Sequence, residues 1–83
     1  MNIKVEIVKH DAAFVGLNRR PMPRFKVMGY VKLGDGGWAG AELVNGPWGE
    51  TDGGNGFTKT VAMQVASLFL SMSDEMARKL VLG

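Results

Sequence analysis

Thr58 and Lys59 have the best chemistry in this sequence for binding an anion. They follow the glycine-rich residues 53–56 and precede the one strongly helical stretch, which continues from Val61. A helix start has unpaired backbone N–H groups, and a hydroxyl and a cation beside them favour a phosphate or a carboxylate. The other interpretation is a plain connection between a strand and a helix.

The remaining polar residues offer little for catalysis. His10 is the single histidine and precedes Asp11; such a pair can orient an imidazole, but no nucleophile motif accompanies it. Glu50 and Asp52 share a glycine-rich loop that lacks the ligand density of a calcium site. We therefore interpret these residues as a surface histidine and solvated turn residues, and we expect no enzyme, no metal site and no cofactor.

A basic strand provides a second candidate surface. Arg24, Lys26, Tyr30 and Lys32 are spaced so that they share one face of a strand, with Lys4 expected beside them. Cations next to an aromatic ring on an open sheet are typical of a nucleic-acid platform. They are also typical of a solvated sheet face, on which lysines oppose edge-to-edge aggregation.

Two arginines and two tryptophans extend this surface. Arg19 and Arg20 are expected at the tip of a loop. Trp48 follows a proline in a turn-rich segment, and it is either an anchor for a protein partner or part of the core beneath the glycine-rich loops. Trp38 is expected on the same face as Tyr30, with burial favoured over exposure.

Length and composition restrict the class of protein. Eighty-three residues predict one domain, residues 1–83, with roughly 4–12 kcal/mol of net stability, to which a homodimer would add. The absence of cysteine removes disulfides and thiolate sites and agrees with a reducing cytoplasm. No apolar run approaches the ~20 residues that span a bilayer, and the alternating first residues do not resemble a signal peptide, so no membrane contact is expected.

The net charge of +2 conceals a segregated pattern. Residues 1–32 hold seven cations against two carboxylates, whereas residues 33–58 hold four carboxylates and no Lys or Arg. Such asymmetry can steer a partner. The favoured alternative is that the two segments lie side by side in the fold and neutralise each other.

Alternation predicts the main strands. Residues 2–7 and 25–33 alternate polar and apolar side chains, and residues 34–37 form a hairpin-turn signal. The returning strand, residues 38–44, is expected to place small or apolar side chains on the inner face, namely Ala39, Ala41 and Leu43.

Proline and glycine interrupt the other segments. Residues 10–23 contain Pro21 and Pro23, which predict a long exposed loop without a regular ladder. Asn45 and Gly46 indicate a second hairpin turn, and residues 47–50 are a candidate edge strand.

One main helix is expected from about Thr58, and its apolar stripe consists of Val61, Val65, Leu68, Phe69 and Met72. Ala62 and Ala66 are expected to widen this stripe with small residues that suit close packing on the sheet. It either continues to Leu80 or restarts with Ser73 as N-cap, and the restart is favoured. The sequence thus predicts an α+β fold, an antiparallel three- or four-stranded sheet with one main C-terminal helix packed on one face.

The glycine-rich turn and the helix after it resemble the C-terminal half of a double-stranded RNA-binding domain. The resemblance covers about residues 23–70, and its matching positions are Gly54, Gly56, Thr58, Lys59, Ala62 and Ala66. It implies a phosphate contact at Lys59. Thr60 and Met63 stand where the family has lysines, and a strand from Asn2 replaces the family's first helix.

In size and style the chain resembles small inhibitors encoded by phages and mobile elements, including anti-CRISPR proteins, which share no motif. This resemblance implies stoichiometric binding, in the cytoplasm, to a protein or a protein–nucleic acid complex. The expected partner-binding residues are Arg19, Arg20, Arg24, Lys26, Tyr30, Lys32 and Trp48. The alternative is direct binding of RNA or DNA through the same face, with Thr58 and Lys59 on a phosphate.

Overall fold

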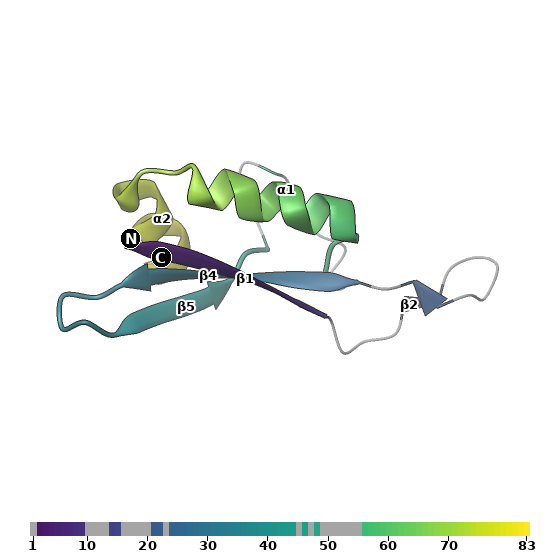
Figure 1. Cartoon of the computed structure of the whole chain (residues 1–83), viewed down its shortest axis with the longest axis horizontal. Coiled ribbons are helices and arrows are strands. Elements are labelled where there is room, and N and C mark those ends of the chain that lie inside the picture. Colours follow the sequence, from purple (N-terminus) through teal and green to yellow (C-terminus); the bar gives the residue numbers. More distant parts are fainter. Residues whose placement is uncertain are drawn as a thin grey trace.

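The computed structural model of the chain describes residues 2–9, 14–15, 21–22, 24–44, 46, 48 and 56–83. These residues form three main strands, a short strand pair and two helices (Figure 1). In chain order they are β1 Ile3–Lys9, β2 Phe14–Val15, β3 Pro21–Met22, β4 Phe25–Lys32, β5 Trp38–Glu42, α1 Lys59–Leu70 and α2 Asp74–Leu82. The predicted α+β class is confirmed, since both helices lie on one face of an antiparallel sheet.

The sheet has the strand order β1-β4-β5, with β4 in the centre. Its register places Ile3 opposite Val31 on the first strand pair, and Val31 opposite Ala39 on the second. The hairpin turn between β4 and β5 is confirmed: Gly36 has a φ of +90°, and the Asp35 carboxylate accepts a hydrogen bond from the Gly37 N–H at 2.9 Å. Glycine suits this turn because residues with a Cβ rarely adopt a positive φ.

Each helix begins at a hydroxyl N-cap. Thr58 Oγ1 accepts a hydrogen bond from the Val61 N–H at 3.4 Å, and Ser73 Oγ accepts one from the Met76 N–H at 3.2 Å. These bonds satisfy backbone donors that the first turn of a helix leaves unpaired. The predicted helix start at Thr58 and the predicted restart at Ser73 are both confirmed.

The core lies between the helices and the inner face of the sheet. Its largest fully buried side chains are Val27 and Val31 from β4, and Val65 and Phe69 from α1. The helix α1 packs on β1 and β4, whereas α2 packs on β4 and β5. Close packing at the centre requires Gly29, because a Cβ there would lie 2.8 Å from Phe69 Cζ.

The predicted apolar stripe of α1 was placed partly wrongly. Val61 is 36% exposed and Leu68 is 45% exposed, while Ala62 and Ala66 are buried. The small alanines allow the helix to approach the sheet, so they form the middle of the buried face and the larger residues move to its flank.

Residues 14–15 and 21–22, the described part of the predicted loop, differ from the prediction. Phe14 pairs with Met22 and Val15 pairs with Pro21, which makes a short antiparallel ladder of β2 and β3. Pro21 is the first residue of β3, a position where a missing N–H is tolerated. The expected loop tip at Arg19 and Arg20 and the candidate edge strand at residues 47–50 lie outside the described residues, apart from Trp48.

Hydrogen bonds connect distant parts of the chain. Phe25 and Phe57 exchange backbone bonds of 2.8 and 2.7 Å, which fixes the start of α1 beside the start of β4. Asn2 Nδ2 donates to Asp74 Oδ2 at 2.9 Å, and Arg78 Nη1 donates to the Lys32 carbonyl at 2.8 Å. Polar contacts therefore tie α2 to the residue before β1 and to the end of β4.

Candidate binding surface on the open face of the sheet

Neither helix covers the second face of the sheet (Figure 1). Side chains alternate between the two faces of a sheet, so the register places every second residue of each main strand on this second face. We call this surface the open face; its residues are Lys4, Glu6, Val8, Lys26, Met28, Tyr30, Lys32, Trp38, Gly40 and Glu42.

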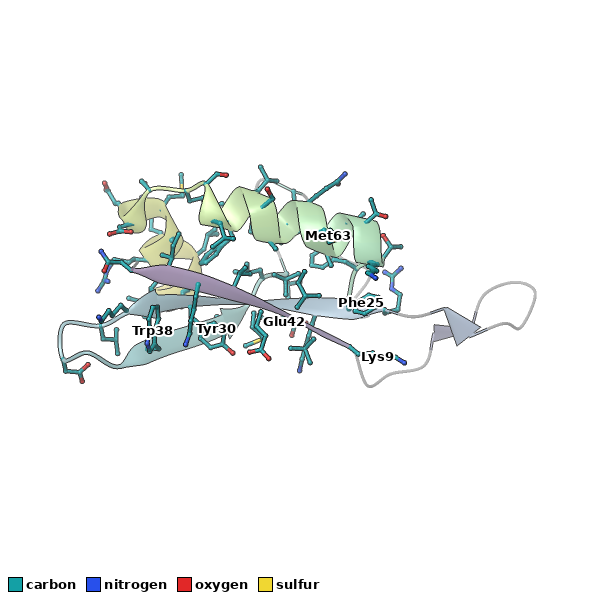
Figure 2. All side chains as sticks on the ribbon, viewed as in Figure 1. Lys9, Phe25, Tyr30, Trp38, Glu42 and Met63 are labelled. Atoms are coloured by element: carbon teal, nitrogen blue, oxygen red, sulfur yellow. The ribbon has the colours of Figure 1, made fainter. Side chains whose placement is uncertain are left out.

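An aromatic and cationic cluster occupies the end of the open face next to the β4–β5 hairpin. The Lys4 Nζ lies 4.4 Å from the ring centroid of Trp38 and 5.3 Å from that of Tyr30. Both distances are within the range of a cation–π interaction. Figure 2 shows Tyr30 and Trp38 projecting on the side away from the helices. We call these three residues the Tyr30–Lys4–Trp38 cluster.

Gly40 provides the space for this cluster. It lies directly opposite Tyr30 in the β4–β5 register, and a Cβ at Gly40 would lie 2.5 Å from Tyr30 Cε1. One edge of the tyrosine ring therefore lies over Gly40, in the space that a Cβ would fill. Any other residue at this position would push the ring away from the sheet.

Trp38 is more exposed than the sequence suggested. Its side chain is 38% exposed, so the expected burial was wrong, although its expected position on the face of Tyr30 is correct. The physical reason is that no helix packs against this face. Among the described residues, Lys4 covers the indole from the neighbouring part of the sheet.

The charges around the cluster are mixed. Lys4, Lys26 and Lys32 contribute three cations, and Glu6 and Glu42 contribute two carboxylates. Glu6 Oε2 accepts a long hydrogen bond of 3.5 Å from the Tyr30 hydroxyl. The open face thus combines an aromatic cluster with neighbouring charges of both signs.

Arg24 and Trp48 have other positions. Arg24 Nη2 donates to the Gly56 carbonyl at 2.6 Å, which ties the start of β4 to the segment before α1. Trp48 is half-buried against the core, its ring lies on Gly46, and its Nε1 donates to the Val44 carbonyl at 3.3 Å. Of the two interpretations of Trp48, its packing corresponds to the core position.

Thr58 and Lys59 lie at the start of α1, as expected, and both are exposed. The first turn of α1 contains no acidic residue, so the positive end of the helix dipole is not neutralised there. The Thr58 hydroxyl is already used as the N-cap acceptor. This leaves the Lys59 ammonium as the group at the junction that could meet an anion.

Several predicted site residues lie outside the described part of the chain. They are His10, Asp11, Arg19, Arg20, Glu50 and Asp52. Among the residues that the structure does describe, no group of three or more His, Cys, Asp or Glu side chains could hold a metal ion. Neither α1 nor α2 has the length and apolar character needed to cross a membrane.

Sequence reasoning did not single out four residues of the open face: Glu6, Val8, Gly40 and Glu42. Glu6 and Glu42 follow from strand alternation once the register is known, because both lie opposite Met28 on the central strand. Gly40 gives no such signal, since its role depends on a ring from the neighbouring strand.

Comparison with known proteins adds no relative to this description. No family model, no curated protein and no solved structure matches the chain.

Proposed function

We propose that this protein is a non-catalytic binding protein that uses the open face of its sheet to bind a partner protein. The observation that carries the proposal is the Tyr30–Lys4–Trp38 cluster, exposed on a face that neither helix covers. Tyr and Trp supply large contact areas at a low cost in side-chain entropy, and they are enriched among the residues that dominate interface energies.

The surroundings of the cluster favour a protein partner. Met28 lies beside Tyr30 on the open face and adds an adaptable apolar surface. Glu6 and Glu42 would repel a phosphate backbone, whereas a protein surface can pair with carboxylates and lysines alike. An aromatic centre with a polar rim is the usual composition of a protein–protein interface.

Within this class we place the protein among small stoichiometric inhibitors of the kind encoded by phages and mobile elements, such as anti-CRISPR proteins. Its size supports this placement, as does the mixed binding face described above. The proposed partner is a protein or a protein–nucleic acid complex. The proposed site of action is the cytoplasm, a reducing compartment that agrees with the absence of cysteine.

A second candidate function is direct binding of RNA or DNA. Lys4, Lys26 and Lys32 share the open face with two aromatic rings, an arrangement on which bases can stack while cations contact phosphates. Lys59 at the start of α1 would add a phosphate contact on a different part of the molecule.

Partner capture with matched variants tests the first candidate. The wild-type chain, Trp38→Ala, Tyr30→Ala and the control Met76→Ala are immobilised, and partners recovered from a host lysate are identified by mass spectrometry. Met76 is 49% exposed on α2, so the control removes an exposed apolar side chain of the helical layer. We expect a partner that binds the wild type and the control at one-to-one stoichiometry and is lost with both aromatic variants. Equal recovery of the partner by all four proteins would show that the open face does not bind it.

A salt titration distinguishes the second candidate. Labelled single-stranded and duplex oligonucleotides are titrated by fluorescence anisotropy at low and at physiological salt. Direct binding predicts an affinity that falls steeply with salt and decreases further with Lys26→Glu and Lys32→Glu. Absence of binding to any oligonucleotide at low salt would eliminate this candidate.

A further inference from the structure

The strand β1 lies at an edge of the sheet, and its backbone groups alternate in direction. The Lys32 N–H donates to the Asn2 carbonyl at 2.8 Å, so Asn2 and the other even-numbered residues of this strand pair with β4. The odd-numbered residues Ile3, Val5 and Ile7 therefore direct their N–H and C=O groups away from β4. No other strand of the described chain pairs with them.

We propose that β1 pairs with β1 of a second copy of this chain in an antiparallel register centred on Val5. In this register Val5 lies opposite Val5 of the second copy, and Ile3 lies opposite its Ile7. These three positions are the ones whose backbone groups are directed outward, so each opposed pair can exchange two hydrogen bonds. The two sheets then join into one continuous sheet of six main strands.

The charges on β1 are self-complementary in this register. Lys4 of each copy lies opposite Glu6 of the other, so the two-fold axis generates two pairs of unlike charge. Opposed unlike charges stabilise a strand pair, and opposed like charges destabilise it. A register centred on Glu6 would instead place two carboxylates opposite each other. A register centred on Ile7 would oppose the aliphatic Val5 to the ammonium of Lys9.

The position of α1 is compatible with the same pairing, because it would bring the α1 helices of the two copies to packing distance. Because α1 packs on both β1 and β4, its axis lies about 2.4 Å inward of β1, half the strand spacing. Each β1 lies about 2.4 Å from the two-fold axis, so each α1 axis lies about 4.8 Å from it. The two α1 axes are then ~10 Å apart, which is the usual distance between packed helices. The second copy is therefore close enough for its α1 to contact this one.

Exposed apolar side chains line this flank. Met63 of α1 is 57% exposed, and Figure 2 shows it on the side of the molecule where β1 lies. Leu70 follows two helical turns later on the same flank and is 43% exposed, and Ile7 on the inner face of β1 is 40% exposed. A second copy covers all three, which accounts for apolar surface that the single chain leaves in water.

The dimer interface lies at the β1 edge and shares Lys4 and Glu6 with the open face, and the dimer adds to the proposed function. A two-fold axis perpendicular to the sheet puts both open faces on the same side. The aromatic rings of Tyr30 on β4 and Trp38 on β5 of the two copies then flank the paired β1 strands. A partner with two equivalent sites would gain avidity from this arrangement.

Charge reversal tests the proposal. Sedimentation velocity on the full chain measures the mass across a concentration series for the wild type, Lys4→Glu, Glu6→Lys and the double variant. We expect the wild type to approach twice 9.0 kDa. Each single variant should dimerise about tenfold or more weakly, because like charges then oppose each other at two symmetric positions. The double variant should regain the wild-type affinity, and an equimolar mixture of the two single variants should form a heterodimer.

Lys32→Glu is the matched control, since it makes the same charge change on β4, away from the edge. It should leave the dimer unchanged. Amide exchange adds a second readout: the Val5 N–H should exchange slowly in the wild type and rapidly in Lys4→Glu, while circular dichroism shows both to be folded. A wild type that stays at 9.0 kDa up to about 200 µM, or a dimer whose affinity neither single β1 variant changes, overturns the proposal.

Discussion

The ring of Phe69 ends against the backbone of Gly29. A Cβ at Gly29 would lie 2.8 Å from Phe69 Cζ and 3.0 Å from Leu43 Cδ2, and all of these groups are buried. The central strand of the sheet and the main helix thus meet at a position where only hydrogen fits. The glycine makes the tight contact of α1 with the sheet compatible with a full-size aromatic ring.

Gly29→Ala should therefore destabilise the protein by about 1–3 kcal/mol, because the added methyl forces Phe69 or the helix to shift. Urea unfolding followed by circular dichroism measures the change. Gly34→Ala is the matched control, since a Cβ there meets nothing within 4 Å, and its effect should stay within about 0.5 kcal/mol. Equal effects of the two substitutions would contradict the tight contact.

Gly40→Ala should move the ring of Tyr30 with little effect on the fold. The flexible, exposed side of the sheet can accommodate the displaced ring, so we expect a stability change below about 1 kcal/mol. The ring-proton chemical shifts of Tyr30 should change, and the affinity for the partner should fall. Unchanged shifts in a folded variant would show that Tyr30 does not lie over Gly40.

Lys4→Met should weaken the cluster because it removes the cation and keeps most of the aliphatic chain. The loss should be about 0.5–1 kcal/mol of unfolding free energy, the size of an exposed cation–π interaction. Lys26→Met is the control on the same face, and it should change stability by less than about 0.5 kcal/mol. Tryptophan emission should shift in the first variant alone, because Lys4 covers Trp38.

Thr58→Ala and Ser73→Ala should each cost about 1 kcal/mol, since each removes the N-cap acceptor of one helix. The two effects should add, because the caps share no partner. Thr60→Ala, in the first turn of α1 but not a cap, should be neutral or slightly stabilising. Thermal or urea unfolding measures all three, and a neutral Ser73→Ala would contradict the observed start of α2.

Local patterns were sufficient to predict the elements that carry strong signals. Alternation over residues 25–33 gave the central strand and its inner face, and Ser73 followed by two acidic residues gave the start of α2. These features depend on residues close in sequence, so they can be recognised without knowing the rest of the fold.

The remaining features depend on contacts between distant residues. Val61 and Leu68 belong to the apolar stripe by spacing, yet they are exposed because Ala62 and Ala66 bring the helix down onto the sheet. The contact of the Tyr30 ring with Gly40 can be predicted only when the register of β4 and β5 is known. Spacing along one segment contains no information about a neighbouring strand, so the open face could be predicted by its residue types but not by its geometry.

The bond between Asn2 and Asp74 has a consequence for the order of folding. It joins residues 72 positions apart, and β1 likewise pairs with β4 across the whole of residues 10–24. The helices have 12 and 9 residues, at or below the ~12–15 at which isolated helices are marginal, so neither should persist before the sheet has formed. Loop closure must therefore precede most of the stabilisation. We expect one cooperative and comparatively slow folding step in place of a helix-first route.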